Sequence, residues 1–173
     1  PILSLARALI RPLPPRAKGI LKNFALAPAR PRGQTCPMPS SHLPRIEHEV
    51  TVMFYDTDCA AVVHNLAYLR FIEEARTIMA EKMGMPLRQM VETGLYPVVL
   101  RTEIDYLSPG QVGERLLVRG GVCQLARVRF GVHFEVVRPE DGTILADCRQ
   151  TLALIRMPGA KAERLPDEWF RKA

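Results

Sequence analysis

One long helix, preceded by a single strand and followed by an almost unbroken series of strands, constrains the fold of this chain most strongly. Apolar residues recur at intervals of three and four over residues 68–83, the spacing of a helix with one buried face. Gly84 and Pro86 are typical helix stop signals, and a short helical turn is expected over residues 87–92. The apolar positions of the long helix are Tyr68, Phe71, Ile72, Ala75, Ile78, Met79 and Met83.

Strand patterns surround this helix. Residues 46–54 alternate imperfectly between apolar and polar side chains, which predicts a first strand. Four further extended runs follow the helix, and Pro/Gly-rich turn signals separate them. These runs cover residues 98–106, 115–125, 129–138 and 144–157, and a terminal helical turn is expected over residues 166–170. The order predicts an α+β domain in which a curved antiparallel sheet of five strands wraps one long central helix.

The first 46 residues differ from the rest of the chain. They hold nine of the 15 prolines and eight of the 24 Lys/Arg residues, but no Asp or Glu. Such a segment cannot sustain regular structure beyond a short helix. We therefore expect a basic Pro-rich leader over residues 1–45, disordered or not native, and one domain over residues 46–173.

Three interpretations of this leader compete. Arg7 and Arg11 interrupt any apolar core, which disfavours a secretory signal. A basic segment without acidic residues fits an organelle transit peptide or a flexible basic tail. Alternatively, Met38 is the natural start, and the residues before it are upstream sequence.

The basic charge does not indicate a nucleic-acid partner. The net charge of +6 belongs to the leader, since residues 47–173 hold 16 Lys/Arg and 18 Asp/Glu. No apolar run approaches the roughly 18 residues of a membrane helix, so no integral membrane association is expected. The cysteines form no CxxC pair and no zinc-type cluster, which favours reduced thiols in the cytoplasm without disulfides. They are Cys36, Cys59, Cys123 and Cys148.

The connection between the first strand and the helix carries the residues best suited to chemistry. Asp56 and Asp58 end the strand, and the helix begins after residue 64. Amides at a helix N-terminus favour negative charge. A thioester carbonyl between Asp58 and these amides would be attacked from one side and polarised from the other. Asn65 can serve both as helix cap and as site residue, and Asp56 is expected to support the loop.

Each of these residues also has a plainer interpretation. Asp58 can be a helix cap or a loop carboxylate. A metal held by Asp56 and Asp58 is disfavoured, because no third ligand lies at a fixed spacing. Cys59 adjoins Asp58 but has no base of its own, so it is expected to be a small apolar filler.

This order of elements resembles the hot-dog fold, and most closely the 4-hydroxybenzoyl-CoA thioesterase-like family with its Tol–Pal-associated acyl-CoA thioesterases. The resemblance covers residues 46–170. It is carried by Tyr55-Asp56-Thr57-Asp58, Val62-Val63, Asn65 and the run from Tyr68 to Arg76, with weaker matches at Tyr106-Leu107-Ser108-Pro109, Gly113-Glu114-Arg115-Leu116 and Leu165-Pro166.

The resemblance implies hydrolysis of acyl-CoA thioesters without metal or cofactor, by a homodimer or homotetramer. It places the catalytic carboxylate at Asp58, as nucleophile or general base, and the polarising main-chain amide at or near Asn65. His64 would line the site or move a proton, and a helix-capping histidine is the alternative. Two positions depart from the family: His64-Asn65 stands where Tyr-His is typical, and Ala60-Ala61 where a glycine is usual.

Substrate contacts are expected from two further groups of residues. Tyr68 and Glu73 would shape the pocket, although Tyr68 equally suits the core and Glu73 an ion pair with Arg76. Glu73 is also the second candidate acid. Arg127 and Arg129 would bind the phosphates of CoA, with solvated surface arginines as the alternative. An acyl-thioester hydratase or dehydratase of the same fold and a non-catalytic acyl-CoA-binding protein remain as alternative functions.

Overall fold

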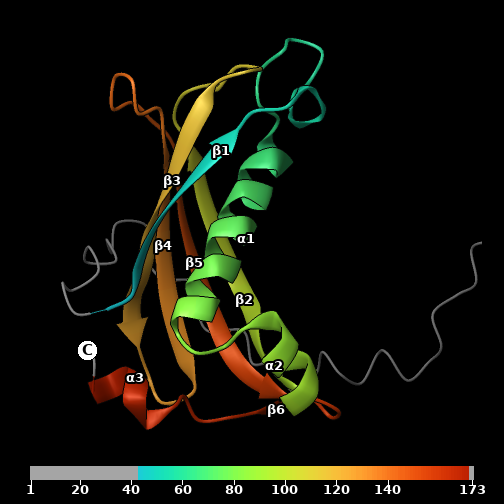
Figure 1. Cartoon of the computed structure of the whole chain (residues 1–173), viewed down its shortest axis with the longest axis vertical. Coiled ribbons are helices and arrows are strands. Elements are labelled where there is room, and N and C mark those ends of the chain that lie inside the picture. Colours follow the sequence, from blue (N-terminus) through green and yellow to red (C-terminus); the bar gives the residue numbers. More distant parts are fainter. Residues whose placement is uncertain (1–42, 172–173) are drawn as a thin grey trace, which may run out of the picture. The chain divides into compact units, whose positions relative to one another are not determined.

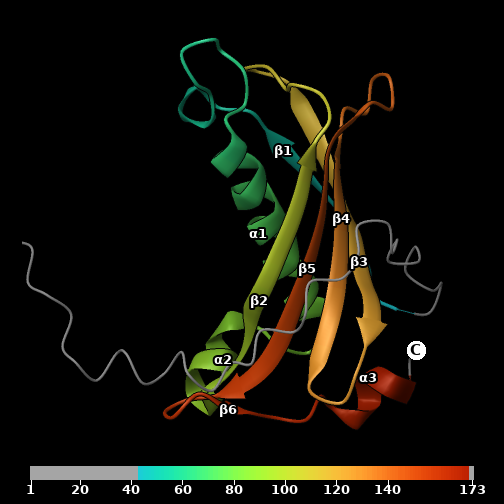
Figure 2. The same cartoon turned by 180° about the vertical axis from the view of Figure 1, so that it is seen from behind.

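The structure, a computed structural model, describes residues 43–171, so that nearly all of the expected leader lies outside the described residues. A curved sheet holds the long helix α1 along its inner face (Figure 1), and its outer face is seen from behind (Figure 2). The elements in chain order are β1 (Arg45–Thr51), the 3-10 turn η3 (Phe54–Asp56), α1 (Asn65–Lys82), α2 (Leu87–Thr93), β2 (Leu95–Tyr106), β3 (Arg115–Leu125), β4 (Arg129–Val137), β5 (Ile144–Arg156), β6 (Lys161–Ala162) and α3 (Asp167–Arg171).

The sheet is antiparallel throughout. Its strands lie in the order β1-β3-β4-β5-β2, and the short β6 pairs with β5. The long connection from β1 to its neighbour β3 therefore contains α1, α2 and β2, which crosses to the opposite edge of the sheet. The predicted α+β architecture, one helix wrapped by a curved antiparallel sheet, is confirmed, with β6 as an additional strand.

The core lies between α1 and the inner face of the sheet. The helix buries Ala67, Tyr68, Phe71, Ile72, Ala75 and Met79, the spacing predicted for its apolar face. Alternate residues of the strands meet them, among them Leu116, Val118, Val132, Phe134, Cys148 and Leu152, all 0% exposed. Burying a side chain of this size contributes about 1.5–3 kcal/mol. This packing holds the N-terminus of α1 at one end of the sheet.

The first strand is shorter than predicted. It ends at Thr51, and Phe54 is 85% exposed instead of continuing the buried face. The reason is η3: the Asp56 amide donates to the Met53 carbonyl at 2.9 Å, and the Met53 amide donates to Asp56 Oδ2 at 3.0 Å. These two bonds close a turn that an extended chain cannot form.

The described cysteines differ from one another. Cys59 and Cys148 are free, whereas Cys123 is disulfide-bonded, so the prediction of reduced thiols is wrong for Cys123. Burial raises the pKa of the Cys148 thiol to about 12. No helix within residues 43–171 has the length and apolarity needed to cross a membrane.

Candidate active site

The loop that carries Asp58 is closed by its own backbone. The Asp58 amide donates to the Val62 carbonyl at 3.0 Å, and the Ala61 amide donates to the Asp58 carbonyl at 3.0 Å. The Asp58 side chain is exposed, and its Oδ1 accepts the Ala60 amide at 2.8 Å. Asp58 therefore sits in a compact turn with its carboxylate in reach of a ligand.

Ala61 adopts a backbone conformation that favours glycine. Its φ is 58°, in the left-handed region. The family resemblance expected a glycine at Ala60-Ala61. The family pattern has a glycine here, and this chain has Ala61, whose methyl group strains the loop.

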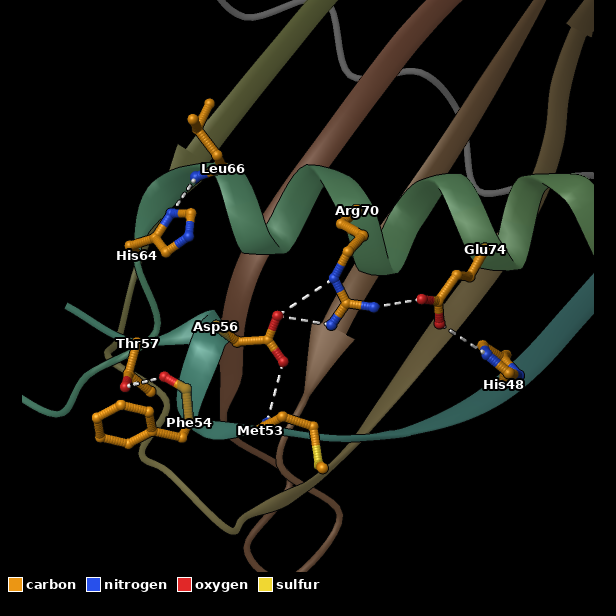
Figure 3. A network of polar contacts seen from close by, with 9 residues as sticks. All are labelled: His48, Met53, Phe54, Asp56, Thr57, His64, Leu66, Arg70 and Glu74. Carbon is orange, nitrogen blue, oxygen red and sulfur yellow. Dashed lines mark hydrogen bonds and ion pairs between the residues drawn. The ribbon is translucent and has the colours of Figure 1, made fainter. Parts of the chain in front are cut away.

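His64, not Asn65, caps α1. The backbone of His64 is extended, and its Nδ1 accepts the Leu66 amide at 3.1 Å (Figure 3). The predicted capping role of Asn65 is therefore wrong: Asn65 is the first residue of the helix, and the imidazole takes the capping position because it reaches the second helical amide. The helix-capping alternative for His64 is confirmed. The cap requires Nδ1 to be unprotonated.

The amide of Asn65 is left for a ligand. The next two amides bond to His64, that of Leu66 to the ring and that of Ala67 to the carbonyl at 3.0 Å. Within the described part of the chain, the Asn65 amide has no hydrogen-bond partner. It lies at the positive end of an 18-residue helix. The structure thus provides a free donor at the residue where the sequence predicted the oxyanion amide.

A polar network connects this loop to α1 (Figure 3). The Asp56 carboxylate is only 2% exposed, and its Oδ1 accepts Arg70 Nη2 at 2.7 Å and Nε at 3.2 Å. Arg70 also donates from Nη1 to Glu74, which lies 3.5 Å from His48. Burial lowers the pKa of Arg70, but the hydrogen bond and charge of Asp56, together with the charge of Glu74, raise its pKa overall. Asp56 supports the loop as predicted, whereas its partner Arg70 carried no signal in the sequence.

Tyr68 belongs to the core and organises a second loop. It is 3% exposed; its hydroxyl accepts the Gly110 amide at 3.0 Å and donates to the Ser108 carbonyl at 3.3 Å. Burial raises the pKa of Tyr68, so the hydroxyl stays protonated. Backbone bonds from Val63 to Gly110 and from Val112 to Ala61 join this second loop to the Asp58 loop. The role of Tyr68 visible here is to hold the two loops together.

The other predicted substrate contacts lie apart from Asp58. Glu73 is exposed and pairs with Arg76, the alternative given for it, and Arg76 also donates to Gln150 at 2.7 Å. Arg127 lies in the turn between β3 and β4, and Arg129 is the first residue of β4. β3 begins beside the end of β1, next to the Asp58 loop, and runs about 30 Å to its far end. One chain therefore does not bring these two arginines to Asp58.

Exposed apolar side chains gather in the segments around the Asp58 loop. Phe54 is 85%, Tyr55 68%, Leu66 63% and Leu107 58% exposed. Tyr106, 46% exposed, donates its hydroxyl to the Asn65 carbonyl at 3.1 Å. Large apolar side chains exposed together mark a surface that binds a ligand or a partner.

Within residues 43–171, one group of side chains has the composition of a metal site, and it includes neither aspartate of the loop. It consists of His133, Glu135 and Asp147, whose ligand atoms lie within 4.8 Å of one another. Arg119 pairs with Glu135 at 2.8 Å, and Arg149 with Asp147 at 3.0 Å. Both carboxylates are therefore already neutralised, which disfavours a cation there.

Comparison with known proteins agrees with this geometry. The family model described as "Thioesterase-like superfamily" matches residues 52–173. A 1,4-dihydroxy-2-naphthoyl-CoA hydrolase of Synechocystis is 28% identical over 123 residues, which cover 70% of this chain and 89% of that protein. The enzyme of the same name from Thermosynechococcus vestitus is 29% identical over 134 residues, 75% of this chain and 91% of that protein.

Solved structures show the same fold. The crystal structure of a 1,4-dihydroxy-2-naphthoyl-CoA thioesterase from Synechocystis superposes with a TM-score of 0.67 at 26% identity, covering 74% of this chain and 94% of that one. A probable thioesterase from Bartonella henselae superposes with a TM-score of 0.66 at 25% identity, covering 70% and 99%. The predicted hot-dog fold and thioesterase family are thereby confirmed.

Proposed function

The chain belongs to the thioesterase-like superfamily, and on that premise we propose that it hydrolyses an acyl-CoA thioester to a free acid and CoA with Asp58 as its catalytic carboxylate. Relatives named as CoA-thioester hydrolases, which match 70–75% of this chain, support this reaction. One observation carries the assignment of the site: the free Asn65 amide begins the helix whose cap is bonded to the Asp58 loop. The candidate carboxylate thus lies in the short connection between η3 and α1, and the candidate oxyanion donor lies where that connection ends.

Two chemical routes use this arrangement. In the first, Asp58 attacks the thioester carbonyl, the Asn65 amide stabilises the oxyanion, and the CoA thiolate leaves a mixed anhydride that water then hydrolyses. In the second, Asp58 removes a proton from water, which attacks the carbonyl directly. His64 holds the helix end in either route and is proposed to line the pocket, whereas Tyr68 supports the two loops from the core and Glu73 pairs with Arg76. Neither route needs a metal or a cofactor.

We propose that the active unit is a homodimer or a homotetramer. Within the described chain, the edge strand β2 pairs with another strand on one side only. The exposed apolar side chains near Asp58 would be buried if a second copy packed against them. In such a pair, the β3–β4 hairpin of a second copy would bring its Arg127 and Arg129 to the phosphates of a CoA bound near Asp58. Light scattering of the purified protein tests the assembly, because a monomer at working concentration would contradict it. The cytoplasmic location stays a prediction.

Replacing Asp58 with Asn tests the function directly. Thiol release from a panel of aliphatic and aromatic acyl-CoAs is measured for the wild type and for Asp58→Asn, with Asp167→Asn on α3 as the matched control. We expect the loss of at least about 10²-fold in kcat for Asp58→Asn only. A wild type that releases no thiol contradicts hydrolysis, and an active Asp58→Asn contradicts the assigned carboxylate. Stabilisation by CoA without turnover would favour the acyl-CoA-binding alternative.

Labelled water can identify the first route. A single turnover in H₂¹⁸O labels the Asp58 carboxylate if the mixed anhydride forms and water attacks it at that carboxyl group, since one oxygen then enters the side chain. A general base leaves the protein unlabelled and sends the label to the acid, and so does attack of water at the acyl carbon of the anhydride. Mass spectrometry of the peptide that contains Asp58 therefore establishes the anhydride when that peptide carries the label.

A further inference from the structure

We propose that Arg70 is a positioning residue of this active site. Acting through the buried Asp56, it sets the Asp58 loop against the N-terminus of α1 and so controls kcat. The inference rests on the thioesterase function proposed above. It assigns to Arg70 no contact with the substrate.

Asp56 is the junction between the two halves of the site. Its backbone carbonyl accepts the amide of His64, the cap of α1, at 3.0 Å. Its side chain accepts hydrogen bonds from the amide of Met53, two residues beyond the end of β1, and from the guanidinium of Arg70 in the second turn of α1 (Figure 3). Asp58 follows two residues later in the chain. A shift of Asp56 therefore changes the position of Asp58 relative to the free Asn65 amide.

Arg70 is suited to hold this junction in place. The two bonds from Nε and Nη2 fix the carboxylate as well as neutralising it. The guanidinium carbon lies 4.8 Å from the centre of the Phe71 ring and 5.5 Å from that of Tyr55. Phe71 is fully buried, so the guanidinium is held over a rigid aromatic surface. The arginine is thus set in place before a substrate arrives.

Loss of Arg70 would release the junction. A carboxylate that is 2% exposed is costly without its cation. The carboxylate regains solvation when η3 turns outward, and that movement breaks the bond between Asp56 and the helix cap. A displacement of about 1 Å at the reacting groups costs on the order of 10²-fold in rate. Because Arg70 does not touch the substrate, the cost falls on kcat and leaves KM nearly unchanged.

Four variants test the positioning role of Arg70, and a fifth serves as control by changing the other ion-pair partner of the same guanidinium. Arg70→Met removes the charge and keeps the apolar stem, and Asp56→Asn removes the partner charge. The double variant Asp56→Asn/Arg70→Met measures their coupling, and Arg70→Lys restores the charge without the forked geometry. Glu74→Gln is the control, because it weakens the second ion pair of Arg70 and leaves the bonds to Asp56 in place. Initial rates are corrected for the folded fraction by circular dichroism.

We expect kcat to fall on the order of 10²-fold in Arg70→Met, with KM within about twofold of the wild type. The double variant should fall no further than the worse single variant, Arg70→Lys should regain part of the loss, and Glu74→Gln should keep the wild-type kcat. A raised KM with unchanged kcat, multiplicative losses in the double variant, or an equal loss in Glu74→Gln would each overturn the proposal. If Arg70→Met does not fold, Asp56→Asn and Arg70→Lys carry the same comparison.

Hydrogen exchange separates this inference from the proposed function. In Arg70→Met, but not in Glu74→Gln, the amides of residues 56–64 should exchange faster, because the bonds that close the loop open more often. Unchanged exchange overturns the positioning role. Faster exchange in a protein without thioesterase activity would keep the positioning role for the loop and reject the function.

Discussion

Replacing Ala61 with glycine should stabilise the protein, although the same change usually destabilises a protein. Ala61 has a φ of 58° and is exposed, so its methyl group causes strain without contributing packing. A side chain in the left-handed region costs roughly 1–2 kcal/mol. Glycine removes this cost and keeps both backbone bonds of residue 61, to Asp58 and to Val112.

The unfolded state sets the net magnitude. Glycine gives the unfolded chain more freedom, which opposes folding by about 0.4–1 kcal/mol. Subtracting this from the relieved strain leaves a gain of about 0.5–1 kcal/mol in the free energy of unfolding. For a domain of this size, that gain raises Tm by roughly 2–5 °C.

Ala60→Gly is the matched control for this change. Ala60 is the adjacent exposed alanine, and its φ is not positive. Its replacement adds the same freedom without relieving strain, so we expect a loss of about 0.4–1 kcal/mol. Urea unfolding of both variants at one protein concentration measures the difference, about 1–2 kcal/mol. If Ala61→Gly loses as much stability as Ala60→Gly, the reasoning about strain is refuted.

Two further predictions concern the core and a turn. Burial raises the pKa of Cys148 from 9.0 to about 12, so above pH 9 the unfolded chain has lost a proton that the native state keeps. The free energy of unfolding should then fall by up to about 1.4 kcal/mol per pH unit until pH 12, and alkaline urea titrations should show a shallower fall in Cys148→Ala than in Cys59→Ala. Gly94→Ala should cost roughly 2–4 kcal/mol, because its φ is 66° and a Cβ would lie 2.6 Å from the Met157 carbonyl oxygen. Gly84→Ala, with a φ of 83° and open space around it, should cost only about 1–2 kcal/mol in the same unfolding assay, and equal losses would contradict the steric argument.

Local patterns were sufficient for most of the fold. The burial of Phe71, Ile72 and Met79 follows from the helical spacing of apolar residues, which can be read from residues close together in the chain. The strands between Arg115 and Arg156 follow from extended runs of neighbouring residues, and Pro/Gly-rich turn signals mark the ends of these runs. The end of β1 was misplaced because Phe54 continues the apolar alternation, while the bonds between Met53 and Asp56 turn the chain away.

The sequence by itself determined the order of elements, the family and the turn in which Asp58 precedes a helix, because these depend on residues close together in the chain. Only the tertiary structure decided that His64 caps the helix and leaves the Asn65 amide free. It alone joined Asp56 to Arg70, and Tyr68 to the backbone of Gly110, 42 residues away. Such contacts depend on how a helix packs against a sheet, and no spacing in the sequence encodes that packing.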